Sequence, residues 1–345
     1  MLGLLAVLCA CGHPAMHDES TLRLARPRLD IGAAVQGRAL RTDSAYATAV
    51  ARHFSIVTTE NALKFGPLRP SRDRYDFSEA DAIVEFAGAH GLAVRGHTLV
   101  WKRQHPAWLT EGAFGRDELL AVLREHILRV VGRYRGRIRA WDVVNEALAD
   151  SLAPGRTSLR PTIWRRVIGP EYIELAFRFA HEADPDALLF YNETGAEGRG
   201  PRSDAAFALV QDLRRRGVPI HGIGMQMHTK LDQPPDTAAL AWNMRRLAAL
   251  GLRVHVTELE VTTANARGTP TERLARQAAI YRGVLAVCLA EPACTALVTW
   301  GVGDRYSWRA PETPLLLDSL MRPKPAYTAM LDLLRDRTPR TGTTR

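Results

Sequence analysis

Residues 116–146 read RDELLAVLREHILRVVGRYRGRIRAWDVVNE and contain one complete step of the pattern that decides the fold. Arg116–Tyr134 carries apolar residues at helical spacing, whereas Arg137–Glu146 is shorter, rich in strand-forming residues and ends in the polar pair Asn145-Glu146. A helix followed by a buried strand with a polar end is typical of α/β proteins with parallel sheets. We therefore expect the same unit to recur along the chain.

The unit does recur over nearly the whole sequence. The candidate strands are Asp30–Gln36, Ser55–Asn61, Ala93–Trp101, Arg137–Glu146, Ala187–Glu193, Gly222–His228, Arg253–Glu260 and Thr295–Gly301. Clear helical patterns cover Ser78–His90 with Ser78 as N-cap and Gly91 as C-cap, Arg116–Tyr134, Glu171–Ala183, Ser203–Arg216 ended by Gly217, and Glu272–Ala290. Eight alternating units predict a single-domain (β/α)8 TIM barrel, with an open doubly wound sheet as the alternative.

Composition fits one large soluble domain. The chain has 345 residues, 46% of them hydrophobic, which is enough apolar material for one core of barrel size. The formal net charge is +9, but the basic residues are spread along the chain and form no cluster interleaved with aromatics. This distribution argues against a nucleic-acid partner and suits an acidic polysaccharide better. We expect a monomer.

The N-terminus indicates export. Met1–Cys11 is a short apolar segment in which Leu8-Cys9-Ala10-Cys11 resembles a lipoprotein cleavage box, although a positively charged n-region is missing. Two alternatives stay open: Cys11 is lipidated and anchors the protein to a membrane, or the segment is an ordinary export signal. The expected organisation is a leader and linker at 1–25, a catalytic domain at 26–336 and a tail at 337–345, in a periplasmic, outer-membrane or secreted protein.

The other two cysteines, Cys288 and Cys294, flank Glu291-Pro292, where the chain must turn. In an exported protein this spacing favours a disulfide over two free thiols. Two cysteines without paired histidines nearby do not make a zinc site, so neither a metal nor another cofactor is expected.

Polar residues gather at the predicted strand ends. They are Glu60-Asn61, His97, Asn145-Glu146, Asn192-Glu193, Gln226 with His228, Glu258 with Glu260, and Trp300. All such ends open on the C-terminal rim of a barrel, where active sites of this fold lie. Carboxylates, amides and indoles without a phosphate-binding loop suit a neutral polyhydroxylated ligand, and cleaving a glycoside requires two carboxyl groups. Glu146 and Glu258 are the best pair, because burial and mutual charge can raise the pKa of one above that of the other.

At this point the sequence resembles glycoside hydrolase family 10, the family of β-1,4-xylanases. The resemblance runs in order from about Leu29 to Leu334 and rests on TENALK at 59–64, GHTLVW at 96–101, WDVVNEA at 141–147, GIGMQMH at 222–228, TEL at 257–259, and the segment from Trp300-Gly301-Val302 to Ser307-Trp308. Two of these motifs fall on the fourth and seventh strands counted above.

The resemblance implies roles for individual residues. Glu146 matches the general acid/base, Glu258 the nucleophile, Asn145 the amide that holds the 2-hydroxyl, and His228 the histidine that hydrogen-bonds the nucleophile. Gln226 lies two residues before His228, so we expect both on one face of their strand. The remaining matches are the glycone-side residues Glu60, Asn61, Lys64, His97, Trp101 and Gln104, and the aromatic walls Trp300 and Trp308.

Several positions depart from the family pattern. Lys102 stands where a histidine is usual, Phe65 where a tryptophan often follows the lysine, and Glu193-Thr194-Gly195 where Asp-Tyr-Asn is typical. The last change removes an aromatic platform from the leaving-group side. Glu260 replaces an aspartate, and its extra methylene must still let the carboxylate orient His228.

The sequence therefore predicts a retaining endo-β-1,4-xylanase. One alternative is action on short xylo-oligosaccharides or related β-1,4-glucosides, which the altered leaving-group side makes plausible. The other is a catalytically silent sugar-binding barrel, which the presence of both glutamates disfavours.

Overall fold

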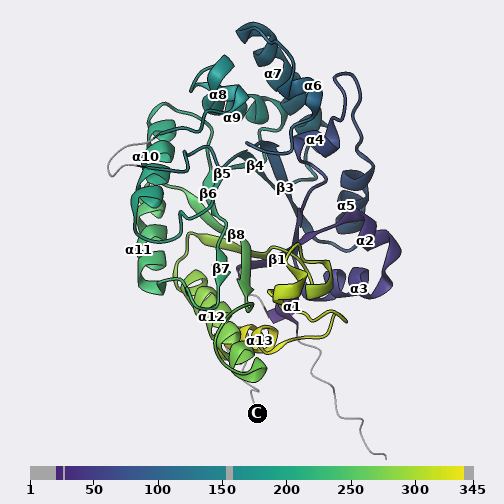
Figure 1. Cartoon of the computed structure of the whole chain (residues 1–345), viewed down its shortest axis with the longest axis vertical. Helices are drawn as coiled ribbons and strands as arrows, with labels where there is room; N and C mark the ends of the chain where they lie inside the picture. Colours follow the sequence, from purple (N-terminus) through teal and green to yellow (C-terminus); the bar gives the residue numbers. More distant parts are fainter. Residues whose placement is uncertain (1–20, 26–27, 153–157, 338–345) are drawn as a thin grey trace, which may run out of the picture.

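The computed structural model describes residues 21–25, 28–152 and 158–337, and strands alternate with helices throughout (Figure 1). The strands are β1 (Asp30–Val35), β2 (Ile56–Thr59), β3 (Ala93–Val100), β4 (Ala140–Asn145), β5 (Leu188–Glu193), β6 (Gly222–Met225), β7 (His228–Lys230), β8 (Arg253–Thr262) and β9 (Cys294–Thr299). The longer helices are α3 (Ser44–His53), α5 (Ser78–Ala89), α7 (Arg116–Arg133), α9 (Tyr172–Ala183), α10 (Pro201–Arg215), α11 (Thr237–Ala248), α12 (Pro270–Ala290) and α13 (Pro325–Arg337). The shorter ones are α1 (Leu22–Ala25), α2 (Gly37–Thr42), α4 (Phe65–Leu68), α6 (Ala107–Thr110) and α8 (Ile163–Val167).

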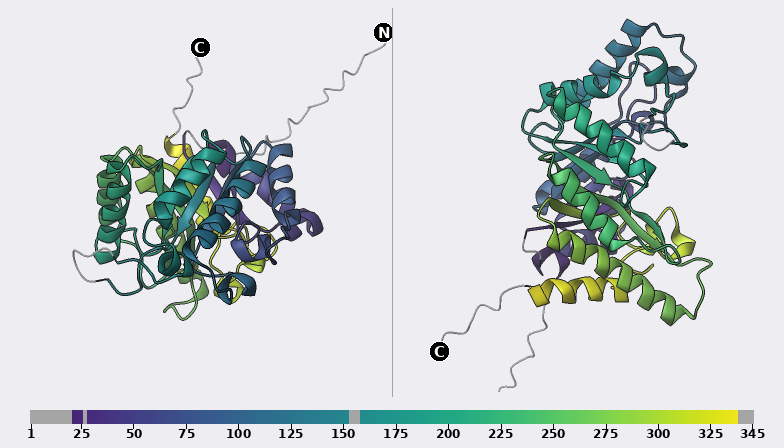
Figure 2. Two further views of the ribbon diagram at one scale, coloured as in Figure 1. Left: turned by 90° about the horizontal axis from the view of Figure 1, so that it is seen from above. Right: turned by 90° about the vertical axis from the view of Figure 1, so that its left-hand side faces the viewer.

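All the strands pair in parallel, and all except β7 close into one barrel. The order runs from β1 to β6, continues with β8 and β9, and returns to β1. Closure depends on two pairings, Asp30 with Ala296 between β1 and β9, and Gly222 with Arg253 between β6 and β8. Helices surround the barrel, and α13 lies along α12 (Figures 1 and 2). The predicted (β/α)8 barrel is confirmed, and the open sheet is excluded.

The predicted sixth strand is divided. β6 ends at Met225, and the separate strand β7 begins at His228 and pairs with β8 through His228 and Glu260. Met227 between them has a left-handed backbone conformation, with φ of 67°. The expectation that Gln226 and His228 share a strand face was therefore wrong, because a residue with positive φ interrupts the extended chain.

The barrel interior is apolar at one level and charged at another. Successive strand residues face opposite sides, so Val94 packs with the helices while its neighbour Arg95 points into the barrel. Both ends of the Arg95 guanidinium fork donate to the buried carboxylate of Asp142, and Nδ1 of His97 lies 2.8 Å from the same carboxylate. Burial opposes the charge of Asp142, but Arg95 and His97 hold its pKa below the ordinary value. These contacts with Asp142 hold the His97 ring in place.

Helix starts follow capping chemistry, with one difference from expectation. Thr269 and Glu272 form a reciprocal capping box at the start of α12. Ser78, predicted as the N-cap of α5, is instead its first residue, and Phe77 is the N-cap. Oδ1 of Asp76 accepts hydrogen bonds from the backbone N (3.0 Å) and the hydroxyl (2.6 Å) of Ser78. The acceptor thus comes from an aspartate two residues earlier.

The packed domain begins before the expected boundary at residue 26. Leu22 in α1 is fully buried, and α1 packs against α13, α3 and β1. Cys11 and the other residues at 1–20 lie outside the described residues, as do 338–345 in the predicted tail. Within the described ranges no helix is long and apolar enough to cross a membrane.

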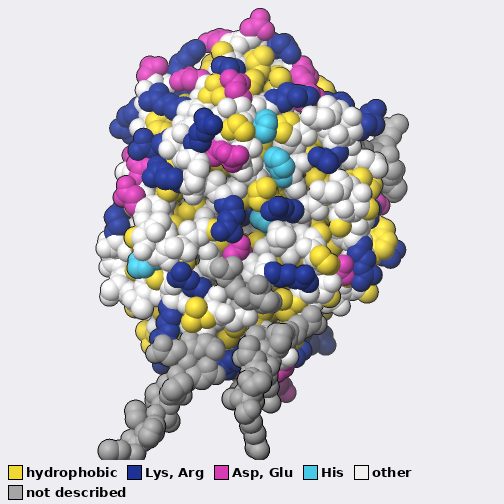
Figure 3. All heavy atoms as spheres, turned by 180° about the vertical axis from the view of Figure 1, so that it is seen from behind, with side chains coloured by type: hydrophobic (Ala, Val, Ile, Leu, Met, Phe, Trp, Pro, Cys, Tyr) yellow, Lys and Arg dark blue, Asp and Glu magenta, His cyan; other side chains and the backbone are white. Residues whose placement is uncertain are grey.

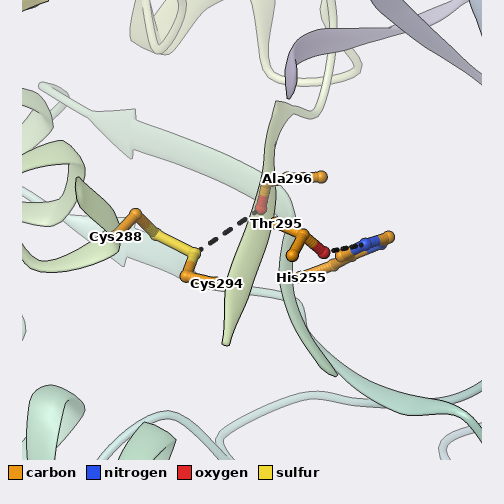
Figure 4. The surroundings of a disulfide bond; sticks show 5 residues. All are labelled: His255, Cys288, Cys294, Thr295 and Ala296. Carbon is orange, nitrogen blue, oxygen red and sulfur yellow. Dashed lines mark hydrogen bonds between the residues drawn. A yellow bond between two sulfur atoms is a disulfide. The ribbon is translucent and has the colours of Figure 1, made fainter. Parts of the chain in front are cut away.

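Cys288 near the end of α12 and Cys294 at the start of β9 form a disulfide, with their Cα atoms 5.1 Å apart (Figure 4). It lies at the start of a barrel strand, away from the rim that carries the polar residues. On the face drawn in Figure 3, Lys and Arg side chains are scattered among acidic and apolar ones rather than gathered in one patch.

Candidate active site

A cleft of about 690 Å³ opens where the barrel strands end. Its lining residues are Glu60, Asn61, Lys64, His97, Trp101, Arg103, Gln104, Asn145, Glu146, Thr194, Gln226, His228, Glu258, Trp300 and Trp308. Every catalytic and substrate-binding residue predicted from the sequence is on this lining, together with Arg103 and Thr194. The barrel topology therefore brings together residues from 60 to 308 in one cavity.

Glu258, near the middle of β8, is held from two directions. Asn192 Nδ2 donates to its Oε1 at 2.8 Å, and His228 Nε2 lies 3.0 Å from its Oε2. The other ring nitrogen of His228 lies 2.9 Å from Glu260 Oε1. Burial opposes a charged imidazole, but the two carboxylates raise the pKa of His228 to about 10. His228 is therefore an imidazolium at neutral pH, and its Nε2 donates to the carboxylate of Glu258.

Glu260 anchors this arrangement from a fully buried position. Besides His228, its carboxylate accepts a hydrogen bond from Trp308 Nε1 at 3.0 Å and lies 3.7 Å from an Arg309 nitrogen. The extra methylene relative to aspartate thus still allows contact with His228. It also ties Trp308, whose ring is largely exposed, to the same carboxylate.

Glu146, directly after β4, has different partners. Its Oε2 lies 2.5 Å from Nζ of Lys102, and its Oε1 accepts a hydrogen bond from Gln226 Nε2 at 3.0 Å. Burial alone raises its pKa, but the hydrogen bonds from Gln226, Lys102 and Trp101 and the charge of Lys102 outweigh burial and lower the pKa below the ordinary value. The sequence led us to expect a raised pKa for one member of the catalytic pair. The hydrogen bond from Gln226, together with the hydrogen bond and charge of Lys102, is the reason that the pKa of Glu146 is not raised.

The backbone at Glu146 is also unusual. Its φ of 54° is left-handed, a conformation that costs about 1–2 kcal/mol for a residue with a side chain. The amide of Glu146 donates to the carbonyl oxygen of Asn192 on β5 at 2.9 Å, which fixes this conformation. Strained backbone held by the surrounding structure is typical of functional positions.

One end of the cleft carries a chain of polar contacts. Lys64 Nζ donates to Asn61 at 2.9 Å, and Asn61 donates to Glu60 at 3.2 Å. The Lys64 ammonium also lies over the rings of Trp101 (4.9 Å) and Trp300 (5.6 Å). Burial lowers the pKa of Lys64 despite the nearby carboxylates. These donors and ring faces suit the hydroxyls and the apolar faces of a bound sugar.

The segment after β5 lacks an aromatic platform. Thr194 lines the cleft where the family pattern has tyrosine, and Tyr191 does not replace it, because its ring is fully buried and its hydroxyl donates to Glu193. Burial raises the pKa of Glu193 to about 7 against the opposing effects of Tyr191 and Arg202. Arg199 packs on the ring of Trp242, 4.2 Å from its centroid, rather than lining the cleft.

Sequence reasoning assigned no role to two connecting residues. Asn192 contacts both Glu258 and Asn145, and Gln36 donates to Glu60 at 3.1 Å. Both lie at ends of predicted strands, so their position was a usable signal. The contact between Lys102 and Glu146 had no such signal, since it depends on the course of the segment after β3. In the described part of the chain, no group of three or more His, Cys, Asp or Glu residues is arranged to hold a metal ion.

Comparisons with known proteins agree with this geometry. The family model described as glycosyl hydrolase family 10 matches residues 22–333. Endo-1,4-beta-xylanase B of Thermotoga neapolitana is 39% identical over 302 residues, covering 85% of this chain and 84% of that protein. The solved xylanase 10B from Thermotoga petrophila RKU-1, in complex with xylobiose, superposes with a TM-score of 0.88 at 37% identity, covering 94% of this chain and 99% of that one. The intracellular xylanase TsXylA from Thermoanaerobacterium saccharolyticum gives a TM-score of 0.83 at 37% identity, covering 91% and 99%.

Proposed function

This chain belongs to glycosyl hydrolase family 10, and from that membership and the cleft we propose that it is a retaining endo-β-1,4-xylanase. The single observation that carries the proposal is the presence, in one sugar-sized cleft, of two buried glutamates with different partners. Glu258 lies against an imidazolium, and Glu146 against a lysine and an amide. Two such carboxyl groups are what double displacement at a glycosidic bond requires.

In the first step, Glu258 attacks the anomeric carbon while Glu146 protonates the departing oxygen. His228 donates to Glu258 and, because Glu260 holds the other ring nitrogen of His228, keeps the Glu258 carboxylate oriented. In the second step, Glu146 takes a proton from water, which attacks the glycosyl-enzyme ester. Asn145, which contacts the amides of Asn192 and Gln226, holds the 2-hydroxyl as positive charge develops on the ring.

The cleft, rather than a closed pocket, favours action within a polymer. The test is release of reducing ends from glucuronoxylan and arabinoxylan, with the lengths of the early products measured by chromatography. A ladder of oligosaccharides supports endo action. Products of one length, or turnover restricted to short xylo-oligosaccharides, would contradict it.

We further propose that the protein is exported. The support is the apolar segment Met1–Cys11 and the size of the substrate, because polymeric xylan cannot enter a cell. Family membership does not decide the location, since the solved relative TsXylA is intracellular. Mass spectrometry of the protein from its native host should show loss of the leader. Intact Met1 on cytoplasmic protein would contradict export.

Lipidation at Cys11 is the narrower form of this proposal. A lipidated protein loses residues 1–10 and partitions into detergent, whereas an ordinary exported protein stays in the aqueous phase. Cys11→Ser should abolish detergent partition without affecting activity. Wild-type protein that loses its leader yet stays in the aqueous phase would leave export intact and contradict lipidation.

A further inference from the structure

Lys102 makes a contact that the reaction does not explain. It follows β3, whose Val100 pairs with Val144 on β4, so Lys102 and Glu146 extend side by side from neighbouring strands. The ammonium lies 2.5 Å from Glu146 Oε2, and both side chains are nearly buried, with 13% and 11% of their surface exposed. Family 10 usually has histidine at this position. In this chain the side chain in contact with the acid/base is a lysine ammonium.

Both oxygens of Glu146 face donors. Oε2 faces the Lys102 ammonium, which has three donors and no acceptor, and Oε1 faces the amide nitrogen of Gln226. A proton on either oxygen would point at another donor, so this arrangement fits a carboxylate and disfavours the acid. General acid catalysis, in contrast, needs the protonated form.

Resting on the function proposed above, we propose that Lys102 is a positioning residue that holds Glu146 ionised in the free enzyme and thereby sets the pH above which the first step loses its acid. The ion pair gives way when the scissile oxygen approaches and Glu146 takes up its proton. In the second step Glu146 acts as a base. The contact with Lys102 then favours the carboxylate form, which is the form that a base requires.

The other charges around Glu146 do not account for its ionisation. Glu193 at the end of β5 and Glu258 across the cleft are like charges, which favour protonation of Glu146. Lys64 after β2 and Arg160 before α8 are cations that interact with Glu146 through space without a direct contact. Lys102 is the cation in contact with the carboxylate among the described residues. The lowered pKa of Glu146 agrees with this geometry.

Lys102 should shift the pH dependence of the first step toward lower pH. The first step requires protonated Glu146, so a contact that stabilises its carboxylate moves the alkaline limb of kcat/KM on xylan to lower pH. Removing the cation should move that limb upward. The acidic phenol of an activated aryl xylobioside leaves without protonation. The alkaline limb of kcat/KM on this substrate should therefore stay in place.

The experiment compares pH profiles of wild type, Lys102→Met and Lys102→Arg on xylotetraose and on the activated aryl xylobioside. We expect Lys102→Met to raise the alkaline limb on xylotetraose by about one pH unit or more, the usual effect of removing an opposite charge in contact. Lys102→Arg should stay near wild type, because it keeps the charge. The limb on the aryl substrate should be the same in all three. A limb on xylotetraose that Lys102→Met leaves unmoved would overturn the proposal.

Arg166→Gln is the matched control. Arg166 lines a pocket that Lys102 also lines, but it is exposed and donates to the carbonyl oxygen of Pro161 rather than to Glu146. Its loss should leave the profile unchanged. An equal shift in this variant would show that the general charge of the pocket acts, not the contact, and would also overturn the proposal.

A titration without substrate separates this inference from the proposed function. The carboxyl carbon of Glu146, labelled with carbon-13 and assigned by its absence in Glu146→Gln, should titrate at higher pH in Lys102→Met than in wild type. This result is independent of which glycoside the enzyme cleaves. Identical titration midpoints in the two proteins would contradict the role of Lys102, whereas wild type without activity on any xylan would contradict the proposed function.

Discussion

The two sides of the cleft hold their carboxylates in different ways. On one side, Glu258 contacts His228, and His228 is fixed by the fully buried Glu260. On the other side, Glu146 contacts Lys102, whose long side chain extends from the segment that follows β3. The nucleophile must be ionised when it attacks and must not be protonated by its neighbours, whereas the acid/base must change its charge twice. A partner fixed in place, such as His228, suits the nucleophile. A partner on a long side chain that can move away, such as Lys102, suits the acid/base.

The largest expected effect tests the nucleophile side. Glu258→Ala removes the group that forms the covalent intermediate, so activity on both xylan and activated aryl glycosides should fall by about 10⁴–10⁶-fold. Added azide should restore only a slow reaction that gives the inverted α-glycosyl azide, identified by NMR. Substantial activity on the aryl glycoside without azide would mean that another residue is the nucleophile.

A smaller and selective effect is expected on the other side. Glu146→Ala leaves the nucleophile in place, so cleavage of xylan should fall by about 10²–10⁴-fold, while the first step on an aryl glycoside with an acidic phenol survives. Azide should speed the second step and give a β-azide with retained configuration. Burst kinetics on the aryl substrate measure the two steps separately. If this variant and Glu258→Ala had the same defects on both substrates, the distinction between the two sides would be lost.

His228 should also stabilise the fold in a pH-dependent way. The pKa of His228 is raised to about 10, so its contribution is fully present below the unfolded value of about 6.5 and is lost as pH rises through about 10. The difference in unfolding free energy between wild type and His228→Gln should thus shrink by roughly 3 kcal/mol between pH 6 and pH 10.5, allowing for solvent screening. Denaturant titrations at the two pH values measure it. A difference that is constant with pH would mean that His228 is not held as an imidazolium.

The smallest effect concerns the segment after β5. Thr194→Tyr should restore a ring face and improve binding of the leaving-group sugar by about 1 kcal/mol, roughly a fivefold gain in kcat/KM on xylotetraose. Aryl xylobiosides, whose leaving group is not a sugar, should gain less, and Thr194→Val serves as a control that adds no ring. Equal gains on both substrates would show that the altered segment does not contact the leaving sugar.

Much of the fold and the cleft was predictable because it depends on local pattern. Glu146 and Glu258 end or interrupt apolar strands, and parallel strands place such residues on one rim whatever the details of packing. The break at Met227 was not predictable, since a left-handed conformation at a methionine has no local sequence signal. The same holds for the contact between Lys102 and Glu146, which depends on where a loop places a long side chain.

The N-cap of α5 is another feature that the sequence alone did not determine. Asp76 and Ser78 are both good capping residues, and the sequence does not say which of them supplies the acceptor. The burial of Leu22, ahead of the expected domain start at residue 26, had no local signal either, because it depends on α13 at the other end of the chain. Contacts between distant segments, rather than local propensity, decided both the boundary and the state of the acid/base.

Double displacement by the two glutamates should retain the configuration of the cleaved sugar. The most direct measurement is a proton NMR time course of xylohexaose hydrolysis at high enzyme concentration, before the product anomers interconvert. We expect the β-anomer signal to appear first and the α-anomer to grow only as mutarotation proceeds. Initial appearance of the α-anomer would indicate a single displacement by water and would contradict the roles assigned to Glu146 and Glu258.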